Sequence, residues 1–250
     1  MSKKFRLAKI LLIFKSVMLF LMLIKTGFWS TALANERLKA DCHTKLEQAR
    51  LWIRATDFNA PKEEKKKVKS AIDIANKACR LARESTPTDG EVLINTAYAL
   101  FAAEKKKEAV KRIQEAAALG YPPAMVMMAR YLGQGKYMEK DSEGAWLLLI
   151  KTLKTKHDAA RIQAALEFLP GGVGPENIKR SKSTLRGLIN EGNSKAMVAY
   201  AMKVLNLKKA KPNTPESTEG MELLERAATK FQNARAMIFL SLLYNQGNVV

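Results

Sequence analysis

A spacing of small and apolar residues recurs along the second half of the chain. It is clearest from Ala124, where an apolar residue follows at +4, a small one at +5, another apolar one at +8 and a glycine at +11. The same order returns from Ala160, Ala196 and Ala236, at steps of 36, 36 and 40 residues, except that Leu207 replaces the glycine in the copy from Ala196. A weaker copy starts 32 residues before the first, at Val92. Periods of this size are typical of proteins built from stacked supersecondary units.

A second set of small residues recurs between these copies, at Ala109, Ala145, Ser181 and Gly220. Each is followed at +7 and +8 by small or apolar residues, and these offsets return to one face of a helix. The repeating unit is therefore a helical hairpin. Proline and glycine gather between the helices, and the extra residues of the longest step fall mostly in the Pro- and Ser/Thr-rich stretch 208–218. No stretch alternates polar and apolar residues, so we predict an all-α fold.

The copy from Ala236, with Leu240, Ser241, Tyr244 and Gly247, resembles the Sel-one-like repeat family, which is related to tetratricopeptide repeats. The resemblance covers residues 88–250. It implies a right-handed α-α superhelix, or solenoid, in which the first helix of each pair lines the concave side. Five hairpins and a final single helix over residues 234–246 fit the length. Residues 35–86 form a divergent N-terminal hairpin in this interpretation, and residues 87–250 form the repeats.

The first 34 residues have the order of a secretory signal peptide. A basic start leads into an apolar stretch from Ile10 to Ile24 and then into Ala32-Leu33-Ala34, a small-x-small site. An uncleaved anchor is the alternative, but Lys15 and Lys25 leave an apolar run far shorter than the ~20 residues that span a bilayer. We expect cleavage after Ala34 and a soluble periplasmic or secreted protein.

Two cysteines remain in the mature chain, in a compartment that permits disulfides. Helices are expected over about residues 36–55 and 62–83, and the midpoint between Cys42 and Cys79 falls in the loop at Ala60 and Pro61. Two antiparallel helices would bring residues equidistant from this loop together. We predict a Cys42 to Cys79 disulfide, with two separately buried thiols as the alternative.

No constellation in the sequence points to catalysis, a cofactor or a metal ion. The histidines are His43 and His157, which are far apart, and neither belongs to a ligand set. The glycine-rich segment 171–175 lacks the Lys-Ser/Thr pair of a phosphate-binding loop. Serine and cysteine lack a nucleophile motif. We therefore expect a non-enzymatic protein that mediates protein–protein interaction in the bacterial cell envelope, as an adaptor or regulator.

The chain is strongly basic, with a formal net charge of +19. Removal of the leader, which holds six basic and no acidic residues, leaves 37 basic against 24 acidic residues, a charge of +13. The lysine runs at 62–69, 105–112 and 179–186 lie on the N-terminal hairpin or on second helices, which the family geometry places on the convex side. The alternative function is therefore a cationic module for anionic envelope polysaccharide or lipopolysaccharide. Export argues against nucleic acid.

The concave face is estimated from offsets +3, +7 and +10 of each first helix, the positions least often apolar. They form a mixed amide, aromatic and sparsely charged set that fits a peptide or a protein helix better than a polyanion. Packing against the neighbouring repeat is the alternative role for any of them. The candidate groove residues are Asn95, Met127, Tyr131, Gln134, Gln163, Glu167, Lys203, Asn206, Phe239 and Gln246.

Overall fold

The structure is a computed structural model that describes residues 31–250 except 58, 170, 175–177, 206–213 and 246–250. Every regular element among these residues is helical. The expected leader, residues 1–34, lies almost wholly outside the described part of the chain. Of the helices that are described, none has both the length and the apolar character needed to cross a bilayer.

Eleven helices follow one another in the described part of the chain, and the first covers residues 31–55. Taken in consecutive pairs, these helices form five hairpins and a last single helix within the described residues. This confirms the predicted all-α arrangement. The bounds are Lys62–Ser85 (α2), Gly90–Ala102 (α3), Lys106–Ala118 (α4), Pro122–Gln134 (α5), Ser142–Leu153 (α6), Asp158–Leu166 (α7), Ile178–Asn190 (α8), Ser194–Leu205 (α9), Pro215–Thr229 (α10) and Ala234–Asn245 (α11).

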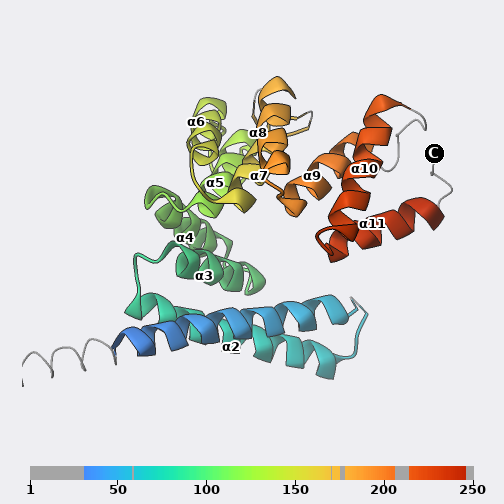
Figure 1. The fold of residues 1–250 in the computed structure, drawn as a ribbon. Coiled ribbons are helices and arrows are strands. Elements are labelled where there is room, and N and C mark those ends of the chain that lie inside the picture. The colour runs from blue at the N-terminus through green and yellow to red at the C-terminus, as the bar shows by residue number, and fades with distance from the viewer. Residues whose placement is uncertain (1–30, 58, 170, 175–177, 206–213, 246–250) are drawn as a thin grey trace, which may run out of the picture. The chain divides into compact units, whose positions relative to one another are not determined.

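The chain divides into two compact units, residues 1–119 and residues 120–250. The first holds the helix over residues 31–55 and α2 to α4, and the second holds α5 to α11 (Figure 1). In the first unit α3 packs against both α2 and α4. In the second unit each hairpin packs on the next, and the first helices α5, α7 and α9 also contact one another in that order.

A disulfide between Cys42 and Cys79 joins the helix over residues 31–55 to α2, with a Cα–Cα distance of 4.4 Å. The predicted pairing is confirmed. Both cysteines are fully buried and belong to a cluster with Leu46, Ala82 and Val92. The core of the first unit thus forms around the covalent link and extends onto α3.

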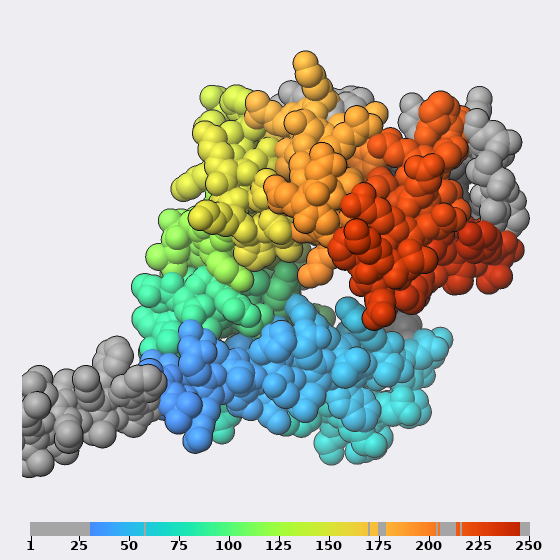
Figure 2. All heavy atoms as spheres, viewed as in Figure 1, coloured from blue at the N-terminus to red at the C-terminus, as the bar shows by residue number. Residues whose placement is uncertain are grey.

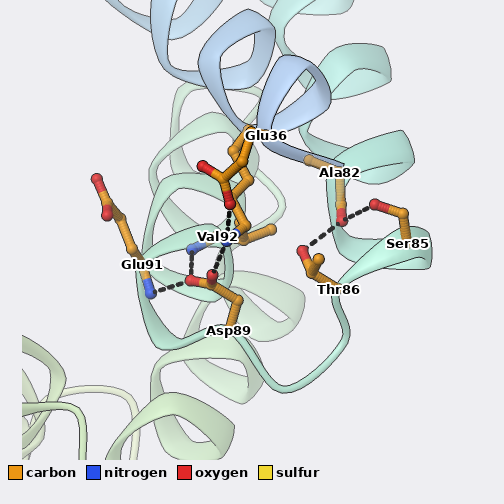
Figure 3. Close-up of polar contacts among 8 residues, drawn as sticks. Glu36, Ala82, Ser85, Thr86, Asp89, Glu91 and Val92 are labelled. Atoms are coloured by element: carbon orange, nitrogen blue, oxygen red, sulfur yellow. Dashed lines mark hydrogen bonds and ion pairs between the residues drawn. The ribbon is translucent and has the colours of Figure 1, made fainter. Parts of the chain in front are cut away.

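The turn between α2 and α3 is held by side chains that satisfy the helix ends (Figure 3). The hydroxyl groups of Ser85 and Thr86 donate to the carbonyl of Ala82, at 3.1 and 2.9 Å. At the start of α3 the Asp89 carboxylate accepts from the backbone N–H groups of Glu91 and Val92, at 3.0 and 3.1 Å. These caps pair polar groups that a helix leaves unpaired at its ends.

Lys39 ties the helix over residues 31–55 to this cap, because its Nζ lies 2.7 Å from Oδ2 of Asp89 and 3.0 Å from Oε1 of Glu36. Desolvation of Asp89 raises its pKa, but the hydrogen bonds from Lys39 and from the backbone of Val92 outweigh it, so the pKa is lowered overall. The hydrogen bonds that Lys39 donates to Asp89 and to Glu36 raise the pKa of Lys39.

The repeat register read from the sequence matches the burial of its small residues. The four that begin the first helices, Ala124, Ala160, Ala196 and Ala236, are at most 3% exposed. The small residues of the second helices, Ala109, Ala145, Ser181 and Gly220, are buried as well. A Cβ at Gly220 would lie 2.8 Å from Cγ of Leu205, so α10 approaches α9 more closely than a larger residue allows.

The residues that cap the first helices are spaced like the repeat, at Tyr121, His157, Asn193 and Asn233. Asn193 accepts from the N–H of Ala196 at 3.1 Å and donates to Asp158 of the preceding first helix at 3.0 Å. Asn233 accepts from the N–H of Ala236 at 3.2 Å and donates to Ser194 at 3.1 Å. Each amide therefore caps its own helix and holds the start of the previous one.

His157 occupies the same position in its repeat. Its Nδ1 accepts from the N–H of Ala160 at 3.1 Å, and its ring meets that of Tyr121 edge-on, with centroids 6.4 Å apart. This histidine therefore acts as a helix cap.

Candidate partner-binding groove

The second unit carries a groove of about 540 Å³ along its first helices. Its walls come from α7, α9 and the start of α11, the side on which the resemblance places the concave face. A volume of this size lies within the range of pockets that hold small ligands or several side chains. The lining residues are Ala159, Ile162, Gln163, Leu166, Lys195, Val198, Ala199, Met202, Lys203, Asn233 and Arg235.

The lining follows the repeat. Relative to Ala160 and Ala196, both α7 and α9 contribute the residues at −1, +2, +3 and +6, and α9 adds the one at +7. These offsets form one stripe along a helix. The residue at −1 of the last repeat, Arg235, continues the stripe onto α11.

The floor of the groove is apolar. Ile162 and Val198 are 4% and 3% exposed and belong to the main core cluster of the second unit. Leu166, Ala199 and Met202 are half-buried and pack against the same cluster. The floor is thus the outer surface of a packed core, which keeps its shape fixed.

The rim is cationic. Lys195, Lys203 and Arg235 are exposed, and no carboxylate is among the lining residues. The Arg235 guanidinium lies 5.9 Å from the centroid of the Phe239 ring, also on α11. Positive charge around an apolar floor favours a ligand that has an apolar anchor and acidic neighbours.

The other side of α9 is fixed by a polar cluster. The Tyr200 hydroxyl donates to Oε2 of Glu219 on α10 at 3.2 Å, and Arg186 of α8 donates to Oε1 of Glu219 at 3.0 Å. Burial of Tyr200, with the Glu219 charge, raises the pKa of its hydroxyl. Because Tyr200 faces α8 and α10, Val198 and Met202 are left on the groove side of α9.

Of the groove residues predicted from the sequence, Gln163 and Lys203 line the observed groove. Phe239 is half-buried and packs against the core cluster beside it. Asn206 and Gln246 lie outside the described residues.

Glu167 has internal partners. It is 8% exposed, its Oε1 accepts from Nε of Arg130 at 2.5 Å, and its Oε2 accepts from the N–H of Val173 at 3.1 Å. Arg130 also donates to Oε1 of Gln163 at 2.8 Å. Glu167 therefore links α5 to the glycine-rich turn after α7, and the predicted role in the groove stays a prediction.

The remaining predicted positions lie on other helices. Asn95 is half-buried on α3, in the first unit. Met127 and Tyr131 are half-buried on α5, and Gln134 is exposed at the end of that helix. None of the four lines the groove formed by α7, α9 and α11.

The sequence criterion missed most of the floor because it selected positions that are seldom apolar. Offsets +2 and +6 are apolar in both repeats, as Ile162 and Leu166 on α7 and as Val198 and Met202 on α9. Residue type therefore does not distinguish these positions from core residues. Their signal was positional: offsets +2 and +6 lie next to +3 and +7, where Gln163 and Lys203 stand.

The basic runs lie where the sequence placed them, on α2, α4 and α8. His43 is exposed on the helix over residues 31–55. Across the described ranges, no three His, Cys, Asp or Glu side chains gather as a metal site would require.

No protein-family model matches the chain, and neither does any curated protein sequence. Among solved structures, the chain is similar to a Sel1 repeat protein from Oxalobacter formigenes, with 18% identity, 84% of this chain and 78% of that chain covered, and a TM-score of 0.48. It is also similar to c5321, a protective antigen present in uropathogenic Escherichia coli strains displaying an SLR fold, with 15% identity, 82% and 42% coverage and a TM-score of 0.44.

Proposed function

We propose that this protein is a non-enzymatic interaction module of the bacterial cell envelope, and that it binds a segment of a partner protein in the groove of α7, α9 and α11. The observation that carries the proposal is the groove itself, with an apolar floor and three cationic side chains at its rim. Its lining offers no carboxylate, histidine or cysteine for catalysis. The buried disulfide and the leader-like sequence of residues 1–34 support export.

The partner segment should carry an apolar side chain that covers Val198 and Met202, with acidic residues beside it. Burial of such an anchor supplies affinity, while the charges of Lys195 and Arg235 supply orientation and a faster encounter. A groove built on helices requires little ordering when the partner binds.

Site-specific photo-crosslinking in the cell envelope tests this. A crosslinker at Met202 should capture a defined protein, and the same group at Leu147, which is 54% exposed on α6, should not. Purified partner should then bind the parent chain, and Lys195→Glu with Lys203→Glu should weaken binding by at least about tenfold. Equal capture from both positions, or binding indifferent to Lys195→Glu with Lys203→Glu and to Met202→Asp, would exclude the groove.

A second candidate function is the binding of anionic envelope polymers by lysines on the second helices of the hairpins. It is favoured by the exposure of Lys105, Lys106, Lys107 and Lys111 on and beside α4. Salt separates the two functions, because at 0.5 M salt exposed charges are screened within about 4 Å. Polymer binding through lysines should disappear there, whereas anchored binding in the groove should persist.

A further inference from the structure

Residues 31–55 and α2 form a hairpin of two long helices (Figure 1). The buried core of this hairpin covers only part of its length. Buried side chains end at Ala49 in its first helix and begin again at Ala75 in α2. Of the described residues between these two, none is buried. From Lys62 to Ile74 a helix rises about 20 Å. We call the described residues from 50 to 74, without residue 58, the tip.

The tip exposes bulky apolar side chains in sequence. Leu51, Trp52 and Ile53 are 64%, 45% and 42% exposed. Consecutive residues of a helix point about 100° apart, so these three cover roughly 200° of the surface. A packed partner helix typically covers a stripe about 100° wide. An apolar surface this broad is better matched by a medium that surrounds the tip than by one protein helix.

The α2 side of the tip is rich in exposed lysine, at Lys62, Lys65, Lys66, Lys67 and Lys69. Across residues 50–74, seven basic residues stand against four acidic ones. The tip, part of the hairpin drawn in blue and cyan in Figure 2, thus combines exposed apolar side chains with an excess of positive charge. Tryptophan and lysine together are the residues that favour the boundary between headgroups and acyl chains.

We propose that the tip inserts into the headgroup region of an anionic phospholipid bilayer. Trp52 and its neighbours enter the acyl boundary, and the lysines of α2 reach the lipid phosphates. A second copy of the chain is disfavoured as the occupant, since two cationic tips repel. The Cys42–Cys79 disulfide holds the base of the tip, so the two helices meet the bilayer already paired.

This membrane contact is separate from the groove, and each proposal stands without the other. It also differs from polymer binding by lysines alone, because it requires Leu51, Trp52 and Ile53 to leave water. The depth of Trp52 in the bilayer is therefore the decisive quantity.

The test uses the chain recovered after export, with Trp29 and Trp146 replaced by Phe so that Trp52 is the single fluorophore. Vesicles of phosphatidylcholine with phosphatidylglycerol should shift its emission to the blue, and brominated lipid tails should quench it. A chain in which Trp146, 38% exposed on α6, is the single tryptophan is the matched control and should show neither effect. Because quenching reports on one side chain, a retained leader would not produce it.

Variants divide the apolar from the ionic contribution. Leu51→Ser with Ile53→Ser should lower partitioning by at least about tenfold, whereas Leu147→Ser should leave it unchanged. Each replacement of a lysine by Gln at Lys66, Lys67 and Lys69 should lower partitioning onto anionic vesicles roughly fivefold. The matched replacement of Lys105, Lys106 and Lys107 by Gln should change partitioning onto the same vesicles little.

Three results would overturn the proposal: Trp52 left unquenched by vesicles that sediment with the chain, partitioning that Leu51→Ser with Ile53→Ser leaves intact, or equal losses from the two lysine sets. Circular dichroism and thermal melting of each variant confirm that the hairpin is folded. Since the replaced tip residues are exposed, these substitutions should not lower the melting temperature.

Discussion

Replacement of Glu167 by Ala should destabilise the second unit while leaving the first unchanged. The substitution removes the acceptor of the Val173 N–H and of Arg130 Nε. A hydrogen bond to a charged group contributes about 1.5–3 kcal/mol, and a buried donor left unpaired costs a similar amount. The Arg130 side chain is 38% exposed and regains water, so its own loss is at most about 1 kcal/mol.

We therefore expect Glu167→Ala to lower the free energy of unfolding by about 2–4 kcal/mol. Glu167→Gln keeps an oxygen for one of the two donors and should cost only about 1 kcal/mol. Urea unfolding followed by Trp146 fluorescence, with Trp29 and Trp52 replaced by Phe, reports on the second unit. With a slope near 2 kcal/mol/M, the midpoint of the Ala variant should fall by roughly 1–2 M.

Equal losses for the Ala and Gln variants would assign the energy to the charge and not to the bond from Val173. An unchanged midpoint for Glu167→Ala would refute the reasoning outright. A normal melt combined with loss of partner binding would instead favour the role in the groove predicted from the sequence.

Three further outcomes are expected. Replacement of both Cys42 and Cys79 by Ser should cost about 4 kcal/mol, the loop-closure entropy for a separation of 37 residues, and should lower the melting temperature of the first unit alone, as differential calorimetry would detect. Gly220→Ala should destabilise the second unit by about 1–3 kcal/mol because the new Cβ would lie 2.8 Å from Leu205. In a double-mutant cycle Gly220→Ala should add little to the loss caused by Leu205→Ala alone, which would identify that contact as the cause. The pKa of Asp89 is lower in the folded state than in the unfolded state. The ionised carboxylate should therefore stabilise the fold fully above the unfolded pKa of about 3.9, and this stabilisation should be lost as pH falls through the folded pKa. The difference in melting temperature between the parent and Asp89→Asn should close over that pH range, and a difference that stays constant with pH would contradict the reasoning.

The helical units and their register were predictable because small residues at fixed spacing leave a periodic signal. Ala124, Ala160, Ala196 and Ala236 are buried as the repeat required. The Cys42 to Cys79 link followed from the loop midway between them. Both inferences depend on spacing along the chain, which the sequence records directly.

The groove was only partly predictable, since its chemistry depends on which side of a helix is left uncovered. Lys195 and Arg235 stand at −1, outside the offsets chosen, so the rim is more cationic than the predicted set suggested. Glu167 stands at +7, one of the offsets used to predict the groove, but its carboxylate accepts a hydrogen bond from Arg130 of α5 and is turned inward. Such choices depend on contacts between repeats.

The groove also depends on the attachment of α11, which supplies Arg235 and is preceded by the amide of Asn233. This helix packs against α10, with Ala236 and Leu243 as its buried residues. A ligand that touches both α9 and α11 binds only while α11 is docked. The free energy of ligand binding therefore also stabilises the docked position of α11. The coupling is reciprocal: a change at Leu243 that loosens α11 lowers affinity without touching the ligand, and a bound partner slows hydrogen exchange in α11.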